Sequence, residues 1–138
     1  MSRDSDRILL YTIIRDKYDG VVPVRFDTIQ EDDDVISSDS PWIMCMIDPY
    51  DSRQHGLGVS TSVRRTLGML VVRIYDREEN GYADILRMED EIEGLFLHKS
   101  FNNGSLRIKR ISSVKRDAYK GWICRINNIH YESDISSV

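Results

Sequence analysis

Apolar residues recur along the chain with two different periods, and these periods predict where helices and strands lie. Residues 3–18 and 82–98 carry apolar side chains at every third or fourth position, which is the spacing of an amphipathic helix. The stripe of the first segment is Ile8, Tyr11, Ile14 and Tyr18, and that of the second is Ile85, Met88, Ile92, Leu95 and Phe96. We therefore expect two helices that pack on a sheet.

Other segments predict strands. Residues 21–26 have a β-like composition but contain Pro23, which cannot donate to a ladder, so a short edge strand is expected there. Residues 42–47 are apolar on both faces, as in a central strand. The remaining strands are predicted at residues 67–75, 106–114 and 122–131. The predicted fold class is α+β, with an antiparallel-rich sheet of about four main strands packed by two helices.

Two polar segments interrupt this pattern. Residues 51–66 include Gly56 and Gly58, and they predict a long mobile loop between the first two main strands. Residues 132–138 read as a frayed C-terminal tail. A length of 138 residues suits one domain that spans the whole chain, residues 1–138.

Charge is unevenly distributed along the chain. The net charge of −4 argues against a dedicated nucleic-acid binder, which usually has a basic face. Residues 1–40 hold ten acidic and five basic side chains, whereas residues 41–138 hold thirteen acidic and fourteen basic ones. No apolar run reaches the roughly 18 residues of a membrane span. Neither a secretory leader nor a membrane partner is therefore expected.

No catalytic constellation stands out in the sequence. His55, His98 and His130 fall in different predicted elements, and Cys45 and Cys124 fall on apolar strand faces, where inert buried thiols are expected. The acidic run at residues 31–34 lacks the spacing of a calcium loop. Gly56-Leu57-Gly58 lacks the lysine and the following helix of a phosphate loop. We expect no enzyme activity, no metal and no cofactor.

Basic residues cluster in the predicted loop and in the strand at 106–114. Such clusters could contact phosphates, protect a sheet edge, or meet an acidic surface of another subunit. The charge asymmetry favours the last alternative, because complementary patches steer association and fix register.

A pattern of core and turn positions runs through most of the chain. It comprises Pro41-Trp42-Ile43, Met46-Ile47, Gly56, Arg64-Arg65-Thr66-Leu67-Gly68, Val71 to Tyr75, Gly81, Leu86, Asp90, Leu95-Phe96, Leu106, Val114, Gly121-Trp122 and Tyr131. In this pattern the chain resembles the tail-terminator (tail-completion, minor tail) proteins of long, non-contractile-tailed bacteriophages. The region before Pro41 matches the family only loosely.

The resemblance implies a structural virion protein, without enzyme activity or cofactor. Its copies would form a hexameric ring at the neck end of the tail, assembled in the host cytoplasm. The ring would cap the tube of major tail protein, stop polymerisation and dock the head–tail connector or neck protein. The tape-measure end is a further implied partner, and DNA would pass through the lumen without specific binding.

The residues proposed for a subunit or tube interface lie in three groups. The loop contributes Arg53, His55, Leu57, Arg64 and Arg65, the acidic run contributes Asp32, Asp33 and Asp34, and the basic strand contributes Arg107 and Arg110. A head-completion or neck connector protein is the nearest alternative, since it forms a ring at the same junction. A ferredoxin-like ligand-binding or regulatory module is the alternative of another class.

Overall fold

The computed structural model describes residues 3–27, 41–55 and 63–136 of the chain, and the following elements refer to these ranges. The N-terminal part contains α1 (Arg3–Tyr18) and β1 (Val24–Phe26). A long pair of strands follows, β2 (Trp42–His55) and β3 (Val63–Arg77). The C-terminal half contains the 3-10 turn η1 (Glu78–Asn80), α3 (Ala83–Phe96), β4 (Ser100–Phe101), β5 (Leu106–Tyr119) and β6 (Trp122–Ser136). Both helix predictions are confirmed.

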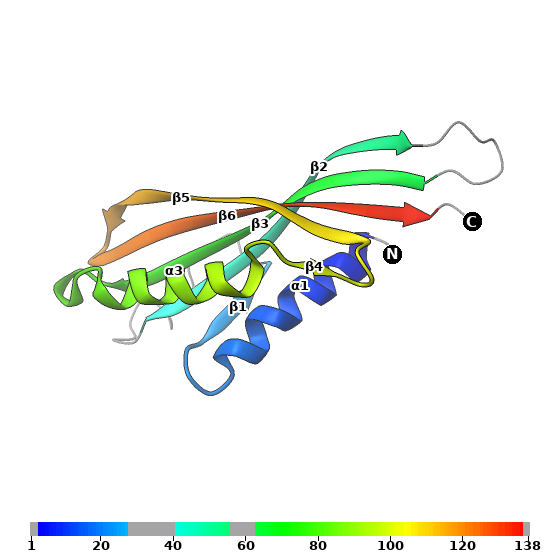
Figure 1. Cartoon of the computed structure of the whole chain (residues 1–138). Coiled ribbons are helices and arrows are strands. Elements are labelled where there is room, and N and C mark those ends of the chain that lie inside the picture. Colours follow the sequence, from blue (N-terminus) through cyan, green and yellow to red (C-terminus); the bar gives the residue numbers. More distant parts are fainter. Residues whose placement is uncertain (1–2, 28–40, 56–62, 137–138) are drawn as a thin grey trace.

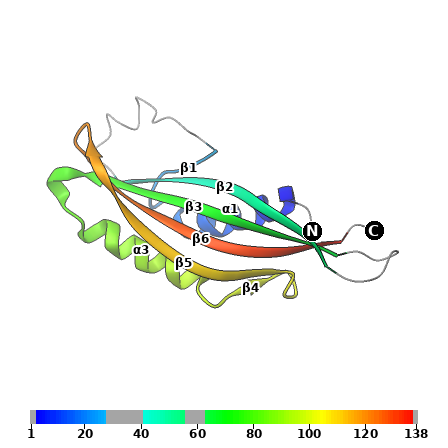
Figure 2. The same cartoon turned by 90° about the horizontal axis from the view of Figure 1, so that it is seen from above.

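The strands form one sheet of six strands in the order β1-β2-β3-β6-β5-β4. Strand β1 runs parallel to β2, and every other neighbouring pair is antiparallel. The sheet is strongly twisted and curls around α1 and α3 (Figures 1 and 2). This follows from the long antiparallel strands, which carry the right-handed twist of each strand along the whole sheet.

The predicted fold class is therefore wrong in two respects. The sheet has six strands and mixed direction, not about four strands in an antiparallel-rich arrangement. The edge segment that contains Pro23 adds a parallel strand. Proline is tolerated there because its carbonyl accepts the backbone N–H of Ile43, and the ladder requires no N–H from the proline itself. The order of strands also differs from a ferredoxin-like fold, which is built from two β-α-β units.

The loop predicted at residues 51–66 is also wrong in its described part. Residues 51–55 continue β2 and residues 63–66 continue β3, with Arg53 opposite Arg65 in the ladder. Residues 132–136 likewise belong to β6 and not to a frayed tail. Polar side chains do not prevent pairing, because the backbone supplies the ladder hydrogen bonds wherever a neighbouring strand is present. Residues 56–62 and 137–138 lie outside the described residues.

Both helices cover the same face of the sheet and enclose the main core. The guanidinium Nε of Arg125 in β6 donates to the Glu89 carboxylate of α3 at 2.6 Å, which fixes that helix on the sheet. The Tyr18 hydroxyl donates to the Met88 carbonyl at 3.3 Å and connects α1 to α3. The buried apolar residues of this core include Leu10, Ile14, Ile43, Leu70, Val72, Ile74, Ile85, Met88, Ile92, Phe96, Leu106 and Ile129. Neither helix in the described ranges is long and apolar enough to cross a membrane.

A second, smaller apolar cluster lies on the opposite face of the sheet. It consists of the buried residues Trp42, Met44, Tyr75, Trp122 and Cys124, with Ile126 packed against it. These residues alternate with core residues along β2, β3 and β6, so each strand is apolar on both faces at this end. We call this side of the sheet, away from the two helices, the outer face.

Candidate functional site

The outer face carries a network of charged side chains at the end of the sheet far from the aromatic cluster. The Arg107 guanidinium donates to Glu132 at 2.8 Å through Nε and to both carboxylate oxygens of Asp134 at 3.0 and 3.1 Å. Arg65 in β3 donates to the same Asp134 at 3.1 Å. Asp134 thus connects three adjacent strands, through a two-point contact with Arg107 of β5 and a single hydrogen bond from Arg65 of β3. The two-point contact between a planar guanidinium and a carboxylate is stronger than a single ion pair.

The charges of this network shift the pKa values of its acids. Hydrogen bonds from Arg107 and Arg65 to Asp134 outweigh desolvation and hold the pKa of that carboxyl below its usual range. Burial raises the pKa of Glu132, but the hydrogen bond from Arg107 and the charges of Arg107 and Lys109 outweigh it, so the net shift is downward. Both carboxylates therefore stay ionised at neutral pH and neutralise most of the positive charge of Arg107.

At the other end of the outer face, the aromatic rings pack closely. Trp42 stacks on Tyr75 with ring centroids 4.1 Å apart, and Trp122 meets Trp42 edge-on at 6.3 Å. The Arg77 guanidinium lies 4.4 Å from the centroid of Trp122. Burial raises the pKa of Tyr75 to about 12, so its hydroxyl keeps its proton and accepts a hydrogen bond from Arg116 at 3.1 Å. These contacts make a closely packed aromatic cluster in which the Tyr75 hydroxyl is protonated at neutral pH.

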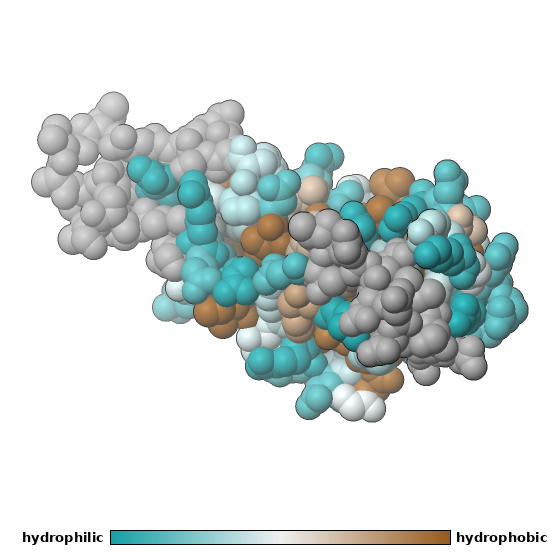
Figure 3. Space-filling model, turned by 180° about the vertical axis from the view of Figure 1, so that it is seen from behind, coloured by the Kyte–Doolittle hydropathy of each residue, from teal (hydrophilic) through white to brown (hydrophobic). Residues whose placement is uncertain are grey.

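Several cations on the sheet remain exposed. Arg64 in β3, and Lys109, Arg110 and Lys115 in β5, are all exposed to solvent. Lys109 lies 3.7 Å from Glu132, but its side chain is 54% exposed. Figure 3 views the molecule from behind, on the side of β1 and β2, where hydrophilic and hydrophobic areas alternate over the described residues. The exposed cations of β5 lie on the opposite side and offer positive charge to a partner.

The structure brings together some of the residues proposed for the interface. Arg65 and Arg107 share Asp134, whereas Arg110 lies further along β5, opposite His130. Arg64 lies next to Arg65 but faces the other way, as alternate residues of a strand do. Arg53 and His55 belong to the far end of β2, opposite Arg65 and Val63. Leu57, Asp32, Asp33 and Asp34 lie outside the described residues.

Glu132 and Asp134 were not predicted as site residues, because both fall in the segment predicted to be a frayed tail. A signal for them was present: Ile129 and Tyr131 alternate with polar residues, and this alternation continues the last strand. The expected charge of the basic strand is corrected accordingly, since Arg107 is paired within the chain and only Lys109, Arg110 and Lys115 of this strand are well exposed.

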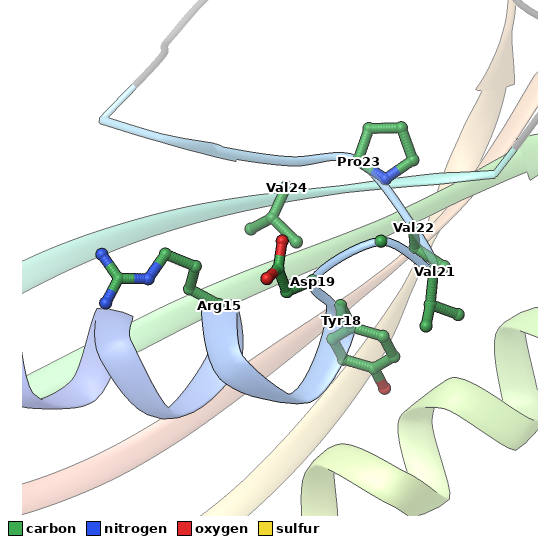
Figure 4. A pocket seen from close by; sticks show the side chains of 8 residues that line it. Arg15, Tyr18, Asp19, Val21, Val22, Pro23 and Val24 are labelled. Carbon is green, nitrogen blue, oxygen red and sulfur yellow. The ribbon is translucent and has the colours of Figure 1, made fainter.

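A hollow of about 470 Å³ lies beside the turn that connects α1 to β1 (Figure 4). Val21, Val22 and Val24 line it together with Arg15, Tyr18 and Asp19. Asp19 and Arg15 carry its charge, and the Tyr18 hydroxyl already donates to a backbone carbonyl. These side chains do not combine a nucleophile with a general base, so the hollow does not have the geometry of a hydrolytic site.

Comparisons with known proteins show the fold alone. The sequence matches no family model, and it matches no curated protein. One solved structure, whose name carries no functional information, superposes with a TM-score of 0.70 at 14% sequence identity and covers 98% of this chain and 97% of that chain. At this identity the likeness establishes a shared arrangement of helices and strands over nearly the whole length of both chains.

Proposed function

We propose that this protein is a structural subunit of a phage tail. Its copies form a ring on the tail tube, end the polymerisation of the major tail protein, and offer a docking surface to the head or neck. The pattern of core and turn residues that resembles tail-terminator proteins motivates the proposal. The partners are further copies of this chain, the major tail protein and a connector or neck protein.

The observation that carries the proposal is the shape of the sheet. The far ends of β2, β3 and β6 extend beyond both helices (Figure 1), so they present strand backbone away from the main core. Nearby on these strands, Arg64 is exposed and Arg65 and Asp134 are partly exposed. Small-molecule sites are usually concave and mainly apolar. A projecting sheet with charged groups suits contact with another protein better.

The charges on the sheet support the same function. A ring of identical copies needs a heterologous interface, in which one surface complements a different surface of the next copy. Arg64, Lys109 and Arg110 are exposed cations on the sheet, and the first forty residues are strongly acidic in sequence. Contact between these regions of neighbouring copies would be attractive and sensitive to salt.

Negative-stain electron microscopy tests this proposal. The purified chain is imaged alone and after mixing with tail tubes assembled from the major tail protein of the same phage. We expect rings that cap one end of each tube. In a parallel sample with head particles that carry their neck, binding there and never on tubes would favour the connector alternative. Association with neither tubes nor heads would contradict the proposal.

A further inference from the structure

We propose that neighbouring copies join by extending the sheet, so that the outer edge of β5 in one copy pairs antiparallel with the outer edge of β2 in the next. This inference rests on the proposed ring and specifies the surface through which it closes. Three properties of the described strands support it: unpaired edges, strand direction and charge.

Strands β2 and β5 are the outermost long strands of the sheet, and each has a stretch of edge without a neighbour among the strands that the structure describes. Strand β4 pairs only with Leu106 and Arg107, and the next backbone N–H, of Ile108, donates to Lys99. No described strand lies beside β5 from Lys109 to Lys115. Unpaired edges are templates for a strand from another chain.

The outer edge of β2 also has a stretch without a neighbouring strand among the described residues. Strand β1 pairs with β2 only as far as Cys45, whose carbonyl accepts the N–H of Asp27. From Met46 to His55 no described strand lies on this side of β2. The two available edges thus belong to opposite sides of the same sheet, which is the arrangement that a heterologous contact requires.

The direction of the strands makes the two edges compatible. Strands β2, β3, β6 and β5 are adjacent and antiparallel, so β2 and β5 run in opposite directions. All copies in a ring point the same way along its axis. Strand β5 of one copy would therefore meet β2 of the next in antiparallel orientation, over the part of each edge that β4 and β1 leave uncovered. With Asp48 opposite Arg110, these parts are residues 46–48 of β2 and residues 110–112 of β5.

Charge at the two edges is complementary. The ladder places Asp48 of β2, Met69, His130 and Arg110 of β5 in one row across the sheet. Asp48 and Arg110 are exposed at the two ends of this row. Beside Arg110, the edge of β5 adds Lys109 and Lys115, so a basic edge would lie against an edge that presents an aspartate. Opposite charges at cross-strand positions favour pairing, and like charges oppose it.

Irregularities in both edges make this pairing selective. The ladder shifts register between Pro49 and Asp51 in β2 and between Ile108 and Arg110 in β5. Bulges, proline and lysine at an edge discourage pairing with an arbitrary strand. Pairing between copies therefore needs a partner edge of opposite charge, which the β2 edge of a second copy presents at Asp48.

Charge reversal tests the pairing. The single variants Asp48→Lys and Arg110→Glu and the double variant are compared with the unmodified chain, and ring formation on tube ends is counted by electron microscopy. Asp90→Lys and Arg87→Glu on the exposed side of α3 are the matched controls. We expect each edge variant to reduce ring formation by about tenfold and the double variant to restore most of it. Circular dichroism of each variant verifies folding.

A disulfide trap gives an independent measurement. Residues directly opposite each other on antiparallel strands have Cα atoms roughly 4.5–5.5 Å apart, within reach of a disulfide. The variant that combines Asp48→Cys with Arg110→Cys should give a ladder of covalent oligomers after oxidation on tube ends, and each single variant should give none. The native thiols of Cys45 and Cys124 are buried and add little background.

The outcomes separate this inference from the proposed function. If rings cap tubes but edge variants behave like the α3 controls and no ladder forms, the edge pairing is wrong while the function stands. If the unmodified chain forms no rings on tubes, the function fails and the edge pairing fails with it. Loss in both single variants, recovery in the double variant and a ladder support the inference.

Discussion

Gly68 in β3 lies directly opposite Tyr131 in β6, and the tyrosine ring fills the space that a side chain at Gly68 would need. A Cβ atom built at this position would overlap the ring carbons and the hydroxyl oxygen. Tyr131 is only 2% exposed, so its ring has little room to move away. The glycine is therefore required for close packing rather than for flexibility.

Replacing Gly68 with alanine should lower the free energy of unfolding by about 1–3 kcal/mol, because overpacking forces a buried ring off its preferred position. Urea denaturation measures this change. Gly94→Ala in α3 is the control, since nothing lies within 4 Å of its Cβ position and alanine should stabilise that helix by up to about 1 kcal/mol. Equal effects of the two substitutions would contradict the packing argument.

Replacing Arg107 with lysine should destabilise the protein by about 1 kcal/mol, although the charge is kept. Lysine cannot form the two-point contact that the guanidinium makes with Asp134 while it also donates to Glu132. Arg87→Lys is the matched control, because Arg87 makes exposed pairs on α3 and should change stability by less than about 0.5 kcal/mol. Chemical denaturation of both variants at neutral pH measures the two changes in the free energy of unfolding. If Arg107→Lys left that free energy unchanged, the network would contribute little to stability.

Asp6 should lower the free energy of unfolding as the pH rises from acidic to neutral. Burial raises the pKa of this carboxyl in the folded chain, and the nearby Ser133 hydroxyl only partly opposes the shift. The unfolded carboxyl loses its proton first, so stability falls as the pH rises from the unfolded to the folded pKa, and the full penalty remains at higher pH. Asp6→Asn should therefore gain stability relative to the unmodified chain as pH rises above about 4. An equal pH profile of both proteins would contradict this account.

The two thiols should be unreactive in the folded protein. Cys45 is fully buried and Cys124 is 2% exposed, and burial raises the pKa of the Cys45 thiol, so little thiolate is available. Titration with a disulfide reagent should modify neither thiol in native buffer and both in strong denaturant. Rapid modification of one thiol in native buffer would show that its strand opens readily.

The local pattern of apolar and polar residues predicted where the helices and main strands lie more successfully than it predicted how long the strands are. Apolar spacing and the following glycine are local signals, and they predicted the bounds of α1 correctly. Of the predicted stripe, Tyr11, Ile14 and Tyr18 are buried, whereas Ile8 is 53% exposed. The ends of β2 and β3 were missed, because their polar residues are held by pairing with each other. Pairing with a neighbouring strand leaves no trace in the composition of the segment itself, because backbone groups make the hydrogen bonds.

The candidate site shows the same division. Arg65, Arg107 and Arg110 could be identified as basic residues from the sequence, but their different environments could not. Arg107 meets Glu132 and Asp134 because β5 and β6 pair in one particular register. A shift of one residue would move those acids to the other face. The register of the strands thus determines which cations pair with acids of the same chain and which remain exposed.

The growth of tail tubes tests the central claim most directly. The purified chain is added to polymerising major tail protein of the same phage, and tube lengths are measured by electron microscopy at successive times. We predict that tubes stop lengthening once a ring caps their growing end, at a ratio of chain to tube protein far below one. Tubes that continue to lengthen at the same rate, with excess chain present and no cap visible, would contradict the account.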